Sequence, residues 1–575
     1  MAKNGNSKAS EQSDPPVTIS LVERDEGRSH DMIYGIEERP PWTSIVLMGV
    51  QHFSVSFSGM LTMPLLLAGP MCFHLDRDLI SQLIATSFFL CGITTLLQTG
   101  LGSRLPIVQG ASMTFVLPAI VMMNLRGPCP TPLTANATEE EIQYVREVAF
   151  ERIREIQGSL CLASLVQLVV GFSGIVGLLL PFIGPITIAT ELILIAIPLI
   201  PIASDACGTN WGISCICIFF VVLFSQFLDK YDIPCPKKKK FALFTFFPIL
   251  LAVGITWVLC LVLTITNVFP EDPSEYGYKA RTDVYTQAIK DSVWIRIPYP
   301  GQWGFPTASA SGFIGMLAAI ISGIVESVGD YHACALIGGA PRPPVHAINR
   351  GIGFEGLGCL AAGLWGSGAG YTSYSNNIAT IGLTKIASRA VIYFSAILFI
   401  ISGICAKFTS FCAALPEPII GAMMATTFGM VASIGFANLS YVKVNTSRNL
   451  FILGMAVFAG IGVPDYLIKN PDALNTGSDV LDQVLEVTLG SSMLIGGITA
   501  CLLDNFVRGT PEERGINWGT EENQTTEDSP CYNLPFGMAW INGVPFLRRL
   551  PFSPTFTGFK KISSLPCRRQ ALSRI

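Results

Sequence analysis

The chain has 575 residues, of which 50% are hydrophobic and 14% are charged, and its mean hydropathy is +0.50. Soluble domains carry about 25% charged residues, so this composition excludes an ordinary soluble protein and indicates a membrane protein. The formal net charge of −4 argues against nucleic acid as a partner. The 16 cysteines are too sparse for a disulfide-rich secreted domain, and most lie in apolar runs where they are expected to pack as small hydrophobic residues.

The N-terminal segment, residues 1–40, is polar and contains no apolar run of the kind that a cleaved signal peptide needs. We expect it to be disordered and cytoplasmic, with the first membrane segment acting as an uncleaved insertion signal. Residues 509–575, which follow the last apolar run, are expected to form a cytoplasmic C-terminal tail.

The apolar runs predict an all-α polytopic membrane protein with about fourteen membrane segments, since a full span needs about 20 residues. The segments are residues 44–69, 79–97, 106–122, 160–180, 183–199, 211–227, 241–266, 311–328, 352–364, 371–383, 391–406, 419–435, 449–462 and 484–503. Together they define a transmembrane domain over residues 41–508.

The third and tenth segments are short and broken. A Gln-Gly-Ala-Ser run at residues 109–112 interrupts the third, and a glycine-rich run at residues 366–370 precedes the tenth. Main chain that is not helical cannot face lipid, so such segments are expected to line a cavity. They occupy equivalent places in two halves of seven, which is typical of a transporter site built from inverted repeats. The alternative is that both are interfacial pieces that bind no ligand.

Short loops rich in Lys and Arg predict the orientation. With fourteen segments and a cytoplasmic N-terminus, the four lysines at residues 237–240 and the basic loops after segments eight, ten and twelve share the cytoplasmic side. The loop at residues 126–157 then lies outside. It contains a predicted surface helix over residues 139–154 and the glycosylation acceptor Asn136-Ala137-Thr138. We therefore predict a glycan at Asn136 and a plasma-membrane location.

Two carboxylates, Glu326 and Asp330, lie at the end of the apolar eighth segment. A charged side chain in hydrocarbon costs at least about 2.5–3.5 kcal/mol. Four residues of helix place both carboxylates on one face, about 6 Å apart along the axis. This pattern favours a cation or polar-solute site over a helix end in the headgroups. In the first segment, His52 follows Gln51. It is either a satisfied core residue or part of a functional polar network.

These motifs resemble the nucleobase–ascorbate transporter family over residues 41–515, nearly the whole chain. The resemblance rests on Gln51-His52, on Glu326-Ser-Val-Gly-Asp330, on the run at residues 339–350 and on Asn376-Asn377-Ile-Ala-Thr-Ile-Gly-Leu-Thr-Lys385. Arg296-Ile-Pro-Tyr-Pro300 and the Pro-Glu-Glu-Arg-Gly run at residues 511–515 resemble the animal branch, which holds sodium-dependent vitamin C and nucleobase carriers.

The resemblance implies two inverted repeats of seven segments, at residues 41–268 and 309–508, arranged as a core and a gate domain. It also implies a homodimer. The family binds its substrate between the third and tenth segments, which implies substrate contacts at Ser112, Met113, Glu326, Asn376 and Asn377. Asp330 is expected to bind sodium as the coupling ion, with His52 in its supporting network.

The chain departs from the family motif at two positions. Asn376 stands where the family has Gln, Glu or Pro, and Ala379 stands where it has Gly. Vitamin C carriers typically have Pro at the first position, so Asn376 favours a nucleobase, with ascorbate as the alternative. Met113 stands where an aromatic residue often stacks on the solute, and a methionine can also pack on a ring face.

The sequence thus predicts a sodium-coupled symporter for a small polar ring compound. The acidic pair argues against an anion exchanger, and the motif departures keep a transport-dead regulator as a further alternative. The sequence contains no enzymatic motif and no phosphate-binding loop, so we expect neither catalysis nor a cofactor.

Overall fold

A computed structural model describes residues 32–73, 76–130, 138–179, 182–228, 230–231, 233–235, 239–241, 243–284, 286–470, 473–510, 512–515 and 530–556. Within these ranges, eight helices are long and apolar enough to cross a membrane, or nine if one bent pair counts as a span. The predicted all-α polytopic architecture is confirmed. The number fourteen stays a prediction, because several segments are short or broken helices. Asn136 and the lysines at 237 and 238 lie outside the described residues.

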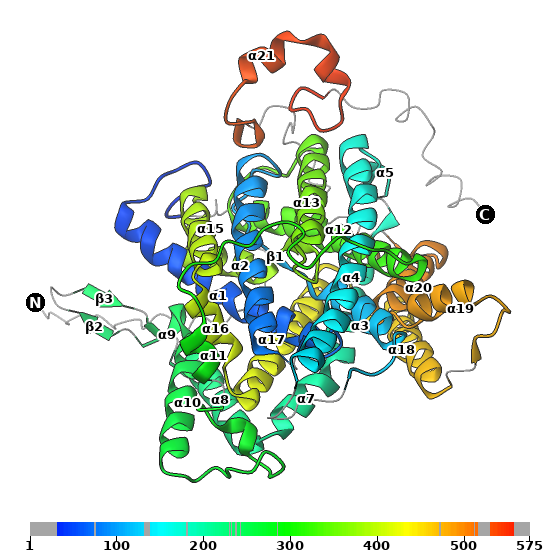
Figure 1. Cartoon of the computed structure of the whole chain (residues 1–575). Helices are drawn as coiled ribbons and strands as arrows, with labels where there is room; N and C mark the ends of the chain where they lie inside the picture. Colours follow the sequence, from blue (N-terminus) through cyan, green and yellow to red (C-terminus); the bar gives the residue numbers. More distant parts are fainter. Residues whose placement is uncertain are drawn as a thin grey trace, which may run out of the picture.

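The order of the elements, most of which Figure 1 labels, repeats in the two halves of the chain. The first half has α1 (Trp42–Ala68), α2 (Arg77–Gly100), β1 (Gln109–Ala111), η2 (Met113–Phe115), α3 (Val116–Asn124) and α4 (Glu139–Ser173). The second half has α12 (Ala310–Ile337), α13 (Val345–Trp365), β4 (Tyr371–Ser373), α14 (Ser375–Thr384) and α15 (Arg389–Ile404). Each half thus has two long helices, a short strand with a short helix, and another helix.

These two sets of elements interlock as one core domain. Helix α4 packs along α13, and its counterpart α15 packs along α2; likewise α1 contacts α15, and α12 contacts α4. Each contact therefore has its mirror in the other half. The antiparallel pairing of β1 with β4, centred on Gly110 opposite Thr372, has the same symmetry. The predicted inverted repeats are confirmed by this arrangement.

The remaining spans form a gate domain with the same internal correspondence. Its first half contains α6 (Pro185–Ala196), α7 (Ile200–Gly208), α8 (Trp211–Val222), a π-helical turn (Leu223–Phe227) and α10 (Pro248–Ile265). Its second half contains α17 (Glu417–Asn438), α18 (Ser447–Lys469), α19 (Asp479–Leu489) and α20 (Ser492–Phe506). Helices α6 and α17 pack together, and the bend between α19 and α20 is 70°. Helices α1 and α12 carry the contacts from the core to α17 and α6.

Shorter elements connect or cover these domains. They are α5 (Val176–Leu179), η4 (Ile197–Leu199), β2 (Ile233–Cys235), β3 (Lys239–Phe241), α9 (Leu243–Phe246), η6 (Tyr278–Ala280), α11 (Thr286–Asp291), α16 (Ala406–Ala413), η7 (Leu439–Tyr441), η10 (Pro530–Tyr532), α21 (Met538–Gly543) and η11 (Pro545–Arg549).

The two strands are buried in the core because their main-chain groups would be unpaired in lipid. The outer N–H groups of β1 donate to Thr95 Oγ1 of α2 at 2.9 Å and to Met60 Sδ of α1 at 3.3 Å. Those of β4 donate to Cys359 Sγ of α13 at 3.3 Å and to Ser327 Oγ of α12 at 3.4 Å. Each strand is thus covered by the first two helices of its own repeat.

The loop at residues 126–157 differs from its prediction. The predicted surface helix is the beginning of α4, a continuous helix of 35 residues that starts at a capping box of Thr138 and Glu141. Arg152 is buried and donates to the carbonyl oxygens of Pro70 at 2.8 Å and Gly127 at 2.7 Å. The polar residues of this stretch suggested a separate surface helix. Arg152 is instead buried because it binds the neighbouring loops.

Two cysteines form a disulfide, which the expectation of simple packing missed. Cys72, just after α1, is bonded to Cys129 in the loop after α3, across a sequence separation of 57 residues. Disulfides persist in oxidising compartments, so the predicted outer position of this loop is consistent with the bond.

Residues near the N-terminus are packed against the core. Ala387 N donates to Tyr34 O at 2.9 Å, and Ser388 Oγ donates to Glu38 O at 2.6 Å. Ile36 is buried. The described part of the segment that the sequence analysis placed in a disordered region, residues 32–40, is therefore attached to the start of α15. Residues 1–31 lie outside the described residues.

The disulfide gives a test of the orientation. In Cys72→Ser, the thiol of Cys129 is released in a half-buried loop, and we expect a membrane-impermeant maleimide to label it from outside intact cells. Cys129→Ser is the matched control, because Cys72 is 0% exposed and should stay unlabelled. Labelling of Cys129 only after the cells are permeabilised would contradict the predicted orientation.

Candidate functional site

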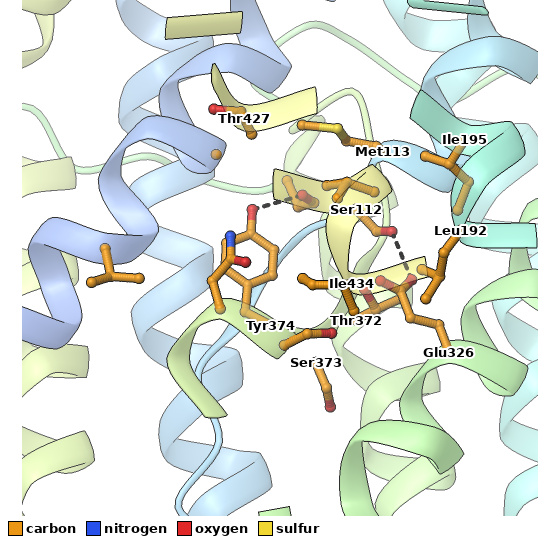
Figure 2. A pocket seen from close by; sticks show the side chains of 16 residues that line it. Ser112, Met113, Leu192, Ile195, Glu326, Thr372, Ser373, Tyr374, Thr427 and Ile434 are labelled. Atoms are coloured by element: carbon orange, nitrogen blue, oxygen red, sulfur yellow. Dashed lines mark hydrogen bonds between the residues drawn. The ribbon is translucent and has the colours of Figure 1, made fainter. Parts of the chain in front are cut away.

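A cavity lies at the boundary between the core and gate domains, where the two broken segments end (Figure 2). The core contributes residues from α1, the end of β1, α12, β4 and the start of α14, and the gate contributes residues from α6 and α17. The lining residues are Val55, Gly59, Ala111, Ser112, Met113, Leu192, Ile195, Glu326, Thr372, Ser373, Tyr374, Ser375, Asn376, Thr427, Val431 and Ile434. The free space of about 60 Å³ exceeds the 10–15 Å³ or so that one water molecule requires.

Ser112 and Glu326 form the polar side of the cavity. Ser112 Oγ donates to Glu326 Oε2 at 3.4 Å, the contact drawn in Figure 2. The Ser112 main-chain N–H donates to Gly370 O at 2.9 Å, which ties this residue to the second broken segment. Glu326 is half-buried on α12. The carboxylate is therefore presented to the cavity by an unbroken helix and oriented by the end of a strand.

Asp330 lies one turn further along α12 and outside the cavity lining. Its Oδ1 accepts a hydrogen bond from Ser375 Oγ at 2.7 Å, and its Oδ2 has no hydrogen-bond partner among the described residues. Asp330 is 7% exposed. Ser375 is the first residue of α14 and lines the cavity, so one side chain connects the second carboxylate to the cavity wall.

The side chains of the predicted residues Asn376 and Asn377 have different surroundings. Asn376 lines the cavity, whereas Asn377 is 0% exposed and faces α1. Asn377 Nδ2 donates to His52 O at 3.0 Å, and Ser56 Oγ donates to Asn377 Oδ1 at 2.6 Å. The Nδ1 atom of His52 lies 3.1 Å from Asn377 Nδ2. His52 and Asn377 thus fix α14 to α1 and do not line the cavity, and His52 is not in hydrogen-bond contact with Asp330 within the described residues.

Tyr374 supplies an aromatic wall that the sequence analysis did not single out. Its hydroxyl donates to Ala111 O at 2.8 Å, so the ring lies across the end of β1 (Figure 2). A Cβ atom at Gly110 would lie 2.3 Å from the ring, and one at Gly59 would lie 3.3 Å from its hydroxyl. Both glycines therefore make room for the ring. The sequence does contain a signal for this role, because Tyr374 is an aromatic residue between the broken segment and Asn376.

Two further intramembrane carboxylates were also missed. Glu355 of α13 is 2% exposed and accepts from Ser373 Oγ at 2.8 Å, and Gln109 Nε2 donates to the same serine at 3.0 Å. Glu191 of α6 is 7% exposed in the gate domain. Both interrupt predicted apolar segments, and a charged residue in such a segment indicates a functional role by default.

The described residues contain no group of three or more His, Cys, Asp or Glu side chains that could hold a metal ion. A sodium ion at Asp330 would therefore have to be bound partly by hydroxyl and main-chain oxygens. The free Asp330 Oδ2 and the nearby Ser375 hydroxyl have the oxygen chemistry that hard cations prefer.

Comparisons with known proteins identify the class. The model of a permease family matches residues 43–468. Solute carrier family 23 member 1 of Rattus norvegicus is 44% identical over 93% of this chain and 91% of its own length. Solute carrier family 23 member 2 of Homo sapiens is 45% identical over 92% and 83%, and nucleobase-ascorbate transporter 1 of Arabidopsis thaliana is 31% identical over 88% and 96%.

The fold and the cavity between its two domains define a membrane transporter, and the chain belongs to the nucleobase–ascorbate transporter family, in the animal solute carrier 23 branch. Members of this family are permeases and not enzymes. Among solved structures, the transmembrane domain of the cyanobacterial bicarbonate transporter BicA has a TM-score of 0.43 and 11% identity, covering 81% of this chain and 99% of that one.

The close approach of Gly110 to Tyr374 gives a test of the cavity wall. Gly110→Ala forces the ring to move, and overpacking of this kind costs about 1–3 kcal/mol. We expect a lower unfolding temperature of the detergent-solubilised protein. In the double variant with Tyr374→Ala the added methyl group has space, so the two losses should not add. Additive losses would show that the ring and Gly110 are not in contact.

Proposed function

We propose that this protein is a plasma-membrane, sodium-coupled symporter that imports a nucleobase. The observation that carries the proposal is the cavity that combines Glu326, Asn376 and the ring of Tyr374. A carboxylate accepts hydrogen bonds from ring N–H groups, an amide pairs with a base edge that has both donors and acceptors, and a phenol ring stacks on a planar solute.

The charge of the lining favours a nucleobase over ascorbate. No Arg, Lys or His side chain lines the described cavity, and Glu326 is its one carboxylate. An anionic solute would meet a negative wall without a cation of the protein to balance it. A neutral ring with N–H donors carries no charge that this wall would repel. Ascorbate remains the second candidate because plant relatives are named as nucleobase-ascorbate transporters. The same lining disfavours an anion exchanger.

The position of Asp330 supports the proposed sodium coupling. Glu326 and Asp330 lie one turn apart on α12, and two unbalanced carboxylates at this spacing repel each other. A sodium ion bound at Asp330 would reduce that repulsion. Its site would share Ser375 with the first turn of α14, next to Asn376. Binding of the ion and binding of the solute are therefore expected to favour each other.

Transport would proceed by movement of the core domain relative to the gate domain. The hydrogen-bonding groups named above belong to the core, whereas Leu192, Ile195, Val431 and Ile434 of the gate present an apolar wall. A solute held by the core would slide past this wall with little loss of polar contact, as rigid-body alternating access requires. A homodimer and cytoplasmic termini are further parts of the proposal.

Uptake measurements test the substrate. Cells that express the protein should accumulate radiolabelled uracil or hypoxanthine in sodium medium and not in choline medium, with ascorbate and urate as competing candidates. Asn376→Pro removes the amide and should abolish nucleobase uptake at normal surface expression. Uptake of ascorbate alone would overturn the nucleobase assignment but not the symporter, and no uptake of any of the four solutes would favour a transport-dead regulator.

The two carboxylates should have separable effects on kinetics. Glu326→Gln removes the charged acceptor, and we expect at least about a tenfold loss of uptake at normal surface expression, since charge-assisted hydrogen bonds are roughly twice as strong as neutral ones. Asp330→Asn should instead lower the apparent sodium affinity, by about tenfold if one ionic contact is lost.

The matched control is Glu417→Gln at the outer end of α17, where the carboxylate pairs with Lys279 at 2.9 Å and lies outside the cavity. It should leave uptake and sodium dependence unchanged. Unaltered sodium dependence in Asp330→Asn would exclude Asp330 from the ion site.

A further inference from the structure

Three buried arginines converge at the predicted cytoplasmic end of the core domain. Arg104 follows α2, Arg350 lies in the second turn of α13, and Arg389 begins α15; they are 9%, 2% and 8% exposed. All three bind main-chain oxygens at the end of α2 or in the loop after it. Arg104 Nη1 donates to Gly100 O at 3.0 Å, Arg350 Nε donates to Gly102 O at 2.7 Å and Arg389 Nε donates to Arg104 O at 2.7 Å.

The C-terminal segment at residues 531–533 covers the side of this arginine cluster that faces away from the core domain. Arg389 Nη2 donates to Cys531 O at 2.5 Å, Arg350 Nη2 to Tyr532 O at 2.7 Å, and Arg104 Nε to Asn533 O at 3.0 Å. Three consecutive carbonyl oxygens thus each accept from a different arginine. Tyr532 is 1% exposed and its hydroxyl donates to Pro341 O at 2.5 Å. In Figure 1 the segment that contains α21 lies beyond the ends of α2 and α13.

The charges of the cluster are not balanced by this contact. Carbonyl oxygens are neutral, and the one carboxylate that forms a salt bridge with the cluster among the described residues is Glu37, 3.6 Å from Arg389 Nη1 and largely exposed. Arg350 Nη1 is buried and has no hydrogen-bond partner among the described residues. Arg350 and Arg389 also lie near the N-terminal ends of their helices, where the helix dipole already favours an anion.

We propose that Arg104, Arg350 and Arg389 form a binding site for a phosphate group on the cytoplasmic face, and that the carbonyl oxygens of residues 531–533 occupy it as a neutral substitute. Guanidinium forks match phosphate oxygens in geometry and supply the charge that carbonyls lack. A phosphate would also satisfy Arg350 Nη1. The phosphate can be a free ion or the headgroup of a phosphorylated lipid, since basic pockets at cytoplasmic helix ends bind such headgroups.

Displacement of the tail follows from this geometry. The tail carbonyls use Arg389 Nη2, Arg350 Nη2 and Arg104 Nε. A phosphate that accepts hydrogen bonds from these same N–H groups would release residues 531–533. Release would expose Cys531, which is a free, half-buried thiol in the docked state. The thiol therefore reports on the position of the tail without reference to transport.

The experiment uses the full-length protein in detergent. Inorganic phosphate is added at constant ionic strength, with chloride as the control ion, and labelling of Cys531 by a maleimide is quantified by mass spectrometry of its peptide together with the unfolding temperature. We expect phosphate, and not chloride, to raise both. In Tyr532→Ala the tail is held less firmly, so the same labelling should need several-fold less phosphate.

Arginine variants complete the test. Arg350→Gln and Arg389→Gln should each abolish the response to phosphate, whereas Arg342→Gln, an exposed arginine on the same side, should retain it. Reconstitution with vesicles of phosphatidylcholine alone or with a phosphatidylinositol phosphate separates the two sources: a response only to the lipid assigns the headgroup. If neither probe changes the labelling while Tyr532→Ala alone raises it, the tail is a permanent part of the core and the proposal is overturned.

Discussion

The architecture depends on one constraint, which is that main-chain groups inside a membrane must be paired within the protein. The two broken segments meet it by pairing with each other, and the flanking helices α1, α2, α12 and α13 pair their outer edges. Ser112 directly follows β1, and Tyr374, Ser375 and Asn376 directly follow β4. The strand pair therefore fixes the core side of the cavity, and every hydrogen-bonding side chain that the core contributes, except Glu326, takes its position from it.

Serines of the broken segments hold the buried carboxylates of the unbroken helices. Ser112 donates to Glu326, Ser375 to Asp330, and Ser373 to Glu355. A hydroxyl donates one proton and carries no charge, so it orients a carboxylate without balancing it. No Lys or Arg forms a salt bridge with these three carboxylates in the described part of the chain. The three carboxylates thus have hydroxyl donors and no balancing salt bridge among the described residues, which is the arrangement on which the proposed sodium coupling rests.

The sequence was informative where the chemistry is local and uninformative where it depends on partners distant in the chain. The run at residues 109–112 predicted a broken segment, and Glu326 and Asp330 predicted a polar site. Their partners could not be predicted, because the register of β1 on β4 is set by packing. Asn376 and Asn377 illustrate the limit: neighbours on a helix point about 100° apart, so one lines the cavity and the other binds α1. Tyr374 was missed because an aromatic residue was sought only at position 113, and the Cys72–Cys129 bond because apolar surroundings do not distinguish paired from unpaired thiols.

The division of the cavity between two domains has a consequence for how such carriers diversify. Under the proposed function, the groups that would recognise a solute lie on the strand ends and α12, and the surface over which it would travel is the apolar face of α6 and α17. Selection could then alter ligand preference by single exchanges on the core, and the speed of the cycle by separate exchanges on the gate. A molecule that fills the polar side of the cavity and also reaches Leu192 and Val431 would contact both domains at once. Such a molecule would hold the two domains in one arrangement, so under the proposed nucleobase assignment a blocker is best sought among base analogues with a bulky apolar extension.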